Sequence, residues 1–254
     1  MTVLWCVIIW GAMADPPPDE RPSDGTEPDP TCCAGPDLNT RIATSFDRRT
    51  DFLRGAQGAF PPLSPVSISL FNALAPDAER GPTVLEFGSG TGGLAVRLLT
   101  AGASHATGVD LSATSVATAQ DRLAAAGFPD ARATFMVGDA TEVVVEPHDW
   151  VVLDRVICCF PDVDRLIGHA ITSARTRIAY SVPESDGWRR IVHRVMWWAE
   201  DSWHTLCGFR PSPGYWHSIR RIESQLAAAG FRPTRQWRFR LWRMAIFERA
   251  APEP

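Results

Sequence analysis

The sequence predicts an α/β fold built on a seven-stranded sheet, and three observations support this prediction. Short apolar segments with strand character alternate with stretches of helical periodicity, which is typical of βαβ units. A glycine-rich turn follows the first of these strands. Four strands end at or next to an acidic residue, and open α/β sheets bind ligands at the carboxyl ends of their strands.

The expected elements follow one another along the chain. Strands are predicted at residues 83–87, 106–110, 132–137, 150–154, 177–182, 231–237 and 239–248. Helices are predicted over 112–126, from an N-cap at Asp162 to about residue 173, and over 216–229. Gly127 and Gly230 follow two of these helices, as C-terminal glycines commonly do. Two more helices, separated by a Pro/Gly-rich turn near residue 60, are predicted between residues 38 and 74.

The glycine turn lies in the segment Val84–Gly93. Gly88, Gly90 and Gly92 occupy alternate positions, and an apolar helix follows. Glycine permits a tight turn and lets backbone N–H groups approach a ligand closely. Glu86 precedes the first glycine by two residues, and its carboxylate favours a cationic ligand over a phosphate.

The later strand ends supply further acids. Asp110 lies 22 positions after Gly88, the spacing at which a βαβ unit places an acid against a ribose diol. Such a carboxylate accepts both hydroxyl hydrogens and repels a 2′-phosphate. Asp139 follows the third strand, and Asp154 ends the fourth.

Together, Val84–Gly93 and these acids resemble the motifs of class I S-adenosylmethionine (SAM) dependent methyltransferases. The segment Val152–Asp162 resembles the region after the fourth strand of UbiE-like members. The resemblance covers about residues 80–249. It implies a Rossmann-like sheet that is mostly parallel with an antiparallel last strand, helices on both faces, and SAM as cofactor. The residues that it assigns to cofactor binding are Glu86, Gly88, Ser89, Gly90, Gly92, Asp110, Leu111, Gly138, Asp139, Ala140, Asp154 and Arg155.

The resemblance also bears on single positions. In the family, the acid after the third strand accepts a hydrogen bond from the adenine amino group, which is the role implied for Asp139. Many UbiE-like members have two histidines where this chain has Cys158 and Cys159, and this departure leaves the general base open. Asp154 and His193 are the catalytic candidates, with His217 as a further possible base. The two cysteines are expected to be small packing residues rather than nucleophiles.

The chain divides into three regions. Residues 1–37 are expected to combine an apolar start with a disordered Pro/Asp-rich tail. The first twelve residues are either an upstream misassignment of the start or an export signal. Residues 38–80 are expected to form an N-terminal helical cap, and residues 81–254 a SAM-binding methyltransferase domain with an aromatic insertion at 183–215. Two interpretations of this insertion stay open, a substrate lid and a segment packed on the sheet edge.

Composition restricts the partners. The formal net charge is −4 and gives no support to nucleic-acid binding. All 25 basic residues are arginine, which excludes a lysine Schiff base. The N-terminal apolar run is too short to span a bilayer. The six cysteines lack zinc-ligand spacing and suit a reducing compartment, so no metal and a cytoplasmic location are expected.

The predicted function is methyl transfer from SAM to a small acceptor, apolar or aromatic in character. Two alternatives remain from the sequence. Gly88, Gly90 and Gly93 also spell the dinucleotide fingerprint, which would make the protein an NAD-linked oxidoreductase. A catalytically silent SAM-binding partner protein would carry the same motifs.

Overall fold

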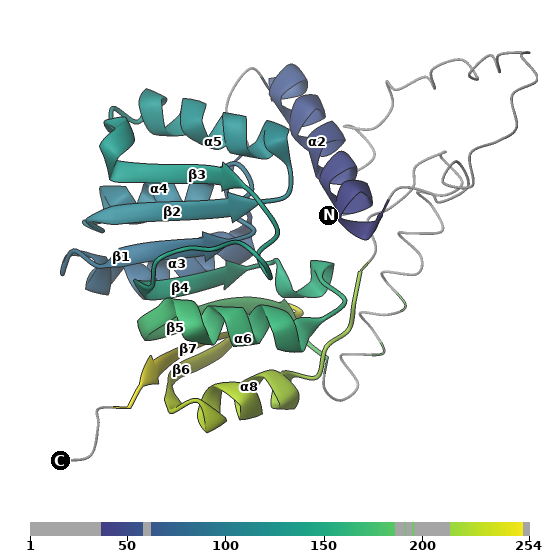
Figure 1. Cartoon of the computed structure of the whole chain (residues 1–254), viewed down its shortest axis with the longest axis vertical. Helices are drawn as coiled ribbons and strands as arrows, with labels where there is room; N and C mark the ends of the chain where they lie inside the picture. Colours follow the sequence, from purple (N-terminus) through teal and green to yellow (C-terminus); the bar gives the residue numbers. More distant parts are fainter. Residues whose placement is uncertain (1–36, 58–61, 186–190, 192–194, 196–213, 251–254) are drawn as a thin grey trace, which may run out of the picture.

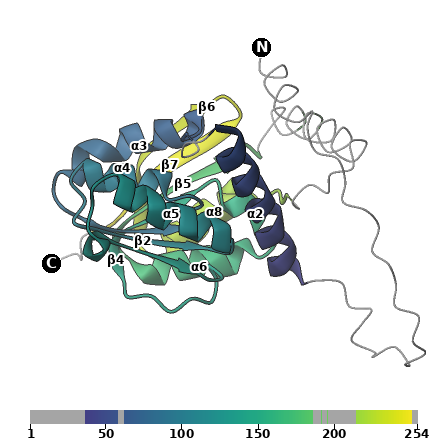
Figure 2. The same ribbon diagram turned by 90° about the horizontal axis from the view of Figure 1, so that it is seen from above.

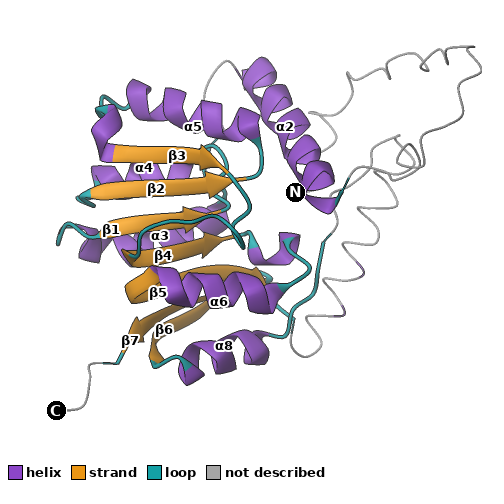
Figure 3. Cartoon of the chain, in the orientation of Figure 1, coloured by secondary structure: helices purple, strands orange, loops and turns teal. Residues whose placement is uncertain are grey.

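A seven-stranded sheet runs through the centre of the computed structural model, with helices on both faces (Figures 1 and 3). The structure describes residues 37–57, 62–185, 191, 195 and 214–250. The strands are β1 (Thr83–Phe87), β2 (His105–Asp110), β3 (Ala133–Val137), β4 (His148–Asp154), β5 (Ala174–Pro183), β6 (Phe231–Phe239) and β7 (Trp242–Arg249). The helices are α2 (Leu38–Gln57), α3 (Pro65–Ala78), α4 (Gly93–Thr100), α5 (Ala113–Ala125), α6 (Val163–Ser173) and α8 (Ile219–Ala228), with short 3₁₀ turns η2 (Asp130–Arg132) and η3 (Ile157–Cys159).

The strand order is β3-β2-β1-β4-β5-β7-β6. Neighbouring strands from β3 to β5 pair in parallel, whereas β7 pairs antiparallel with both β5 and β6. The predicted fold is therefore confirmed, including its antiparallel last strand. The chain leaves β1 on one side to form β2 and β3 and returns on the other side to form β4. This reversal at β1 and β4 is the place where open α/β sheets bind ligands.

Helices lie on both faces of the sheet (Figure 2). An apolar core on each face holds them against it. Side chains of a strand alternate between faces, so Val84 of β1 packs with α3, α4 and α5, while Leu85 and Phe87 pack with α6 and α8. All three are fully buried, and burial of each such side chain contributes about 1.5–3 kcal/mol.

Some element ends differ from the sequence-based expectation. The last helix begins at Ile219 rather than 216, because Tyr215 N–H donates to the Cys158 carbonyl (2.8 Å) and a ring nitrogen of His217 bonds the Phe160 carbonyl (2.7 Å). The last strand begins at Trp242 because Arg240, with φ of 56°, lies in the turn after β6. Non-glycine residues rarely adopt positive φ, so the sequence pattern does not mark the turn at Arg240 itself.

Helix α2 lies across the carboxyl ends of the strands, whereas α3 packs against the sheet beside α4 (Figures 1 and 2). Strand β6 is one of the two edge strands of the sheet, and most of its residues are exposed. Its pairing with β7 shifts register between Pro233 and Arg235. Within the part of the chain that the structure describes, no helix is both long and apolar enough to cross a membrane.

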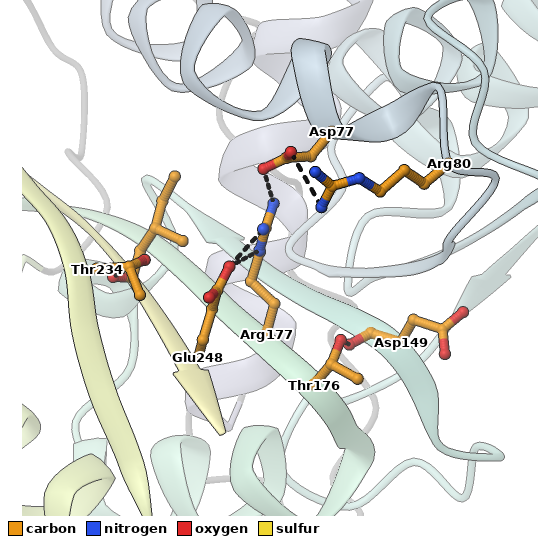
Figure 4. Close-up of polar contacts among 8 residues, drawn as sticks. Asp77, Arg80, Asp149, Thr176, Arg177, Thr234 and Glu248 are labelled. Atoms are coloured by element: carbon orange, nitrogen blue, oxygen red, sulfur yellow. Dashed lines mark hydrogen bonds and ion pairs between the residues drawn. The ribbon is translucent and has the colours of Figure 1, made fainter. Parts of the chain in front are cut away.

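A charged cluster around Arg177 joins α3, β5 and β7 (Figure 4). It lies at the amino ends of the parallel strands, whereas the strand-end acids lie at their carboxyl ends. The Arg177 side chain is 8% exposed, its Nη1 lies 2.8 Å from Asp77 Oδ2, and its Nε donates to Glu248 Oε1 at 3.1 Å. Its guanidinium carbon lies 4.5 Å from the Trp150 ring centroid. The cluster borders a cavity of about 380 Å³ at the amino ends of β4 and β5.

Replacing Arg177 with alanine should lower the free energy of unfolding by about 1–3 kcal/mol, because a buried cation that bridges two half-exposed acids is lost. The matched control is Arg80→Ala. Arg80 pairs with the same Asp77, but its side chain is 78% exposed. That change should cost less than about 0.5 kcal/mol. Urea denaturation of both variants measures the difference, and equal losses would contradict a special role for Arg177.

Candidate cofactor site

The glycine turn between β1 and α4 is held in left-handed backbone conformations. Gly88, Gly90 and Gly92 have φ values of 70°, 51° and 69°. A Cβ at Gly88 would lie 2.4 Å from Val156 Cγ2, and one at Gly92 would lie 2.7 Å from Ala119 Cβ. A Cβ at Gly90 would meet no atom within 4 Å. Gly88 and Gly92 are therefore required by packing, whereas Gly90 faces open space.

Asp110 fastens the end of β2 to this turn. Its Oδ2 accepts the backbone N–H of Gly90 at 2.8 Å, and its Oδ1 accepts that of Ser112 at 2.9 Å. Burial raises the pKa of the Asp110 carboxyl, and the two backbone donors partly oppose this shift. Each carboxylate oxygen keeps one lone pair, so the pair of oxygens can accept two hydroxyl groups. The next residue, Leu111, is half-buried against the core on the α6 face.

Glu86 is a buried acid whose charge is incompletely compensated. The residue is 4% exposed, and its Oε2 lacks a hydrogen-bond partner among the described residues. Burial, followed by the charge of Asp154 and then that of Asp110, raises the pKa of its carboxyl well above the ordinary value. The buried Ser89 hydroxyl also lacks a described partner. Unsatisfied buried polar atoms of this kind indicate that a ligand completes the site.

Asp139 follows β3 and is surrounded by donors. Its Oδ1 accepts both the backbone N–H (2.7 Å) and the hydroxyl (2.8 Å) of Thr141. Its Oδ2 accepts the side-chain amide of Asn39 from α2 at 2.7 Å. On either side of Asp139, Gly138 N–H donates to the Asp110 carbonyl (2.9 Å), and the buried Ala140 bonds the His169 ring through its carbonyl (2.7 Å). The end of β3 is thus fixed beside Asp110.

Asp154 ends β4 and is held by the neighbouring strand. Its Oδ1 accepts the Ser181 hydroxyl at 2.5 Å, and the Ser181 oxygen accepts Arg155 N–H at 2.9 Å. Arg155 has φ of 59°, and its exposed side chain lies over the Trp242 ring, 5.6 Å from the centroid. Strand β4 pairs with β1, and the charge of Asp154 acts on Glu86. Arg155 turns towards Trp242 of β7.

Cys158 and Cys159 follow in η3, and both thiols donate to the Arg155 carbonyl (3.8 and 3.7 Å). Cys158 is buried and Cys159 is half-buried. The interaction between the two neighbouring thiols, followed by burial, raises the pKa of Cys158 well above its ordinary value, and the same interaction lowers the pKa of Cys159. The buried Cys158 fits the expected packing role. Among the described residues, no group of His, Cys, Asp and Glu could hold a metal ion.

The structure brings together the predicted residues from β1, β2, β3 and β4 at the carboxyl ends of these strands. His193 and most of the insertion at 183–215 lie outside the described residues. Sequence reasoning missed three polar residues that hold the site, namely Asn39, Asp47 and Ser181. Asp47 of α2 accepts the Ser112 hydroxyl (2.5 Å) and Thr114 N–H (3.1 Å) at the start of α5.

The two crowding patterns in the glycine turn predict different mutant phenotypes. Gly88→Ala should lower the free energy of unfolding by about 2–4 kcal/mol, because the new methyl group overlaps Val156 and the backbone is strained. Gly90→Ala should cost only about 1–2 kcal/mol of backbone strain but should weaken ligand binding, because its methyl group enters the open space. Gly127→Ala, also at positive φ in open space, is the control for strain alone. Thermal unfolding and calorimetric titration separate the effects, and a Gly90 variant that binds like Gly127→Ala would remove Gly90 from the site.

Comparison with known proteins shows which family this part of the chain resembles. Residues 84–175 match the family model described as the methyltransferase domain. Over 110 residues, 41% of this chain, the sequence is 30% identical to ribosomal RNA small subunit methyltransferase A of Prochlorococcus marinus. The match spans only 38% of that relative's length.

Solved structures share the fold. The magnesium protoporphyrin IX methyltransferase from Synechocystis PCC 6803, crystallised with bound S-adenosylhomocysteine (SAH), superposes with a TM-score of 0.64 at 21% identity, covering 83% of this chain and 99% of that one. An O-methyltransferase family protein from Burkholderia thailandensis gives 0.63 at 17% identity, covering 85% of this chain and 64% of the other. Residues 84–175 therefore match a methyltransferase domain, and the chain has the fold of class I S-adenosylmethionine-dependent methyltransferases.

Proposed function

We propose that this protein transfers the sulfonium methyl group of SAM to a small acceptor that is apolar or aromatic. The observation that carries the proposal is the gathering of Glu86, Asp110 and Asp154 around the glycine turn, with Glu86 buried and incompletely paired. Acidic groups in mutual repulsion favour a ligand that brings positive charge, as SAM does through its sulfonium and ammonium groups. The anionic pyrophosphate of NAD would add to the repulsion, so the same observation opposes the oxidoreductase alternative.

Each part of SAM has a matching group in this proposal. Asp110 accepts the ribose hydroxyls, because each of its oxygens keeps a lone pair beside Gly90 and Ser112. Asp139 and the backbone of Ala140 take the adenine base. Glu86 and Asp154 provide negative charge for the methionine end, with Gly88, Ser89, Gly90 and Gly92 allowing its close approach.

The acceptor side is proposed to lie around Asp154, Arg155 and Trp242. Transfer is an in-line displacement in which the sulfonium charge disappears, so alignment and exclusion of water supply most of the rate. Asp154 retains Oδ2 as an acceptor after its Oδ1 bonds Ser181, and it is a general-base candidate where the acceptor atom must lose a proton. His193 as a base and the insertion at 183–215 as a substrate-side element stay predictions from the sequence, because His193 and most of the insertion lie outside the described residues.

Titration calorimetry with SAM, SAH and NAD tests cofactor identity directly. Release of SAH should then be followed with a small-molecule extract and, separately, with ribosomal RNA, which the curated relative's name makes the sharpest competing acceptor. Turnover only with RNA would overturn the small-acceptor proposal. Tight SAM binding without release of SAH in either mixture would favour the silent-partner alternative.

Asp110→Ala should weaken SAM binding by about 1.5–3 kcal/mol, or roughly tenfold to a hundredfold, because two charge-assisted hydrogen bonds to the ribose are lost. Asp130→Ala, an exposed acid in η2, is the control and should bind normally. Calorimetry gives both affinities, and thermal unfolding shows whether each variant is folded. Unchanged affinity in a folded Asp110 variant would remove this residue from the site.

The raised pKa of Glu86 predicts a pH dependence. The folded protein favours the protonated carboxyl, so its stability contribution is complete below the ordinary pKa of 4.5 and is lost as pH rises through the folded pKa. SAM favours the ionised form, so SAM affinity should rise with pH over the same window. SAH lacks the sulfonium charge and should show a smaller rise.

Glu86→Gln checks this linkage. The variant should lose most of the dependence of SAM affinity on pH, while Asp110, whose pKa is also raised, leaves a residual slope. Binding measured between pH 5 and pH 9 reports both slopes. Parallel pH profiles for the wild type and the glutamine variant would show that Glu86 does not titrate on binding.

A further inference from the structure

Helix α2 is fastened at two points to the loops that hold the proposed adenosine site. Near its start, Asn39 donates to Asp139 Oδ2 at 2.7 Å. About two turns further along the helix, Asp47 accepts the Ser112 hydroxyl at 2.5 Å. The Thr50 and Ser115 hydroxyls lie 3.0 Å apart in a buried contact in the same region. These two points follow β3 and β2 respectively, so α2 spans the ends of both strands (Figure 1).

The start of α2 is itself fixed, which gives the Asn39 contact a defined geometry. Asp37 caps the helix, because its Oδ1 accepts Thr40 N–H at 2.8 Å and its Oδ2 accepts the Thr40 hydroxyl at 3.1 Å. Ile42, between one and two turns after the cap, is 3% exposed, so the same stretch of helix is buried on one side. Asn39 therefore does not depend on a loose end of the chain for its position.

The hydrogen bonds of Asp139 leave one acceptor position of its carboxylate for a further donor. A carboxylate oxygen accepts about two hydrogen bonds. Oδ1 already accepts two, both from Thr141, whereas among the described residues Oδ2 accepts only the amide of Asn39. An additional donor must therefore bind Oδ2 next to Asn39. The orientation of that oxygen is set by Thr141 on one side and by Asn39 on the other.

We propose that Asn39 is a positioning residue that aims Asp139 Oδ2 at the amino group of the adenine base. The proposal rests on the SAM-binding function stated above. It makes recognition of the base depend on α2, which lies before the segment 84–175 that matches the methyltransferase domain. When α2 is seated, the base amino group meets an oxygen held from both sides. When Asn39 is missing, only the two hydrogen bonds from Thr141 to Oδ1 hold the carboxylate, so Oδ2 is aimed less well.

The experiment compares two ligands on three proteins. The ligands are SAH and its analogue in which hydrogen replaces the amino group of the base. The proteins are the wild type, Asn39→Ala and the control Thr44→Ala, whose hydroxyl is exposed and bonds only the carbonyl of Thr40 in its own helix. Calorimetry gives the affinities, and thermal unfolding verifies folding. The wild type should prefer SAH over the analogue by about tenfold or more.

Asn39→Ala should weaken SAH binding by about three- to tenfold while changing the affinity for the analogue less than about twofold. The preference for the amino group should therefore shrink, and Thr44→Ala should keep it. Equal losses for both ligands would overturn the proposal, since they would show that Asn39 only supports α2. An unchanged preference would overturn it as well. A wild type that binds neither ligand would instead defeat the SAM-binding function itself.

A double-mutant cycle keeps the proposal falsifiable if Asn39→Ala also loosens α2. Asp139→Ala removes the acceptor oxygen, so adding Asn39→Ala to it should cost no further SAH affinity. Losses that multiply in the double variant would show that the two residues act independently, which contradicts a positioning role.

Discussion

The gathering of acidic side chains at the carboxyl ends of the parallel strands is the constraint on which the rest of the site depends. Parallel pairing places Glu86 of β1, Asp110 of β2 and Asp154 of β4 at the same edge, and burial makes their charges costly. The protein compensates two of them with local donors, from the glycine turn and Ser112 for Asp110 and from Ser181 for Asp154. Glu86 is compensated least. That imbalance is the basis of the cation selectivity that we propose for this site.

The site also extends beyond the segment that matches the methyltransferase domain. The matched residues 84–175 contain the glycine turn and the four acids. Ser181 on β5, which holds Asp154, lies after this segment, and α2, which holds Asp139 and the start of α5, lies before it. The family core thus supplies the charges, while flanking parts of this chain determine how rigidly they are held.

The fold and the main acids could be predicted because their signals are local. The spacing from Gly88 to Asp110 and the alternation of apolar strands with helices are visible within short windows of sequence. Asn39 and Asp47 could not be found in this way, because their partners lie 100 and 65 positions away. The turn between the last two strands was expected about two residues too early for a different reason, since a non-glycine residue in the left-handed conformation, here Arg240, leaves no mark in the pattern.

The exposed edge strand β6 has a consequence for how copies of this protein meet in concentrated solution. An open strand edge offers unpaired N–H and C=O groups that can template aggregation. Here the outer strand contains Pro233, which cannot donate a hydrogen bond, and its register shifts just after that residue. Arg232, Arg235 and Arg238 are exposed along the same strand, so a second copy would bring like charges together. The edge of the sheet is thereby protected from growing into an intermolecular one.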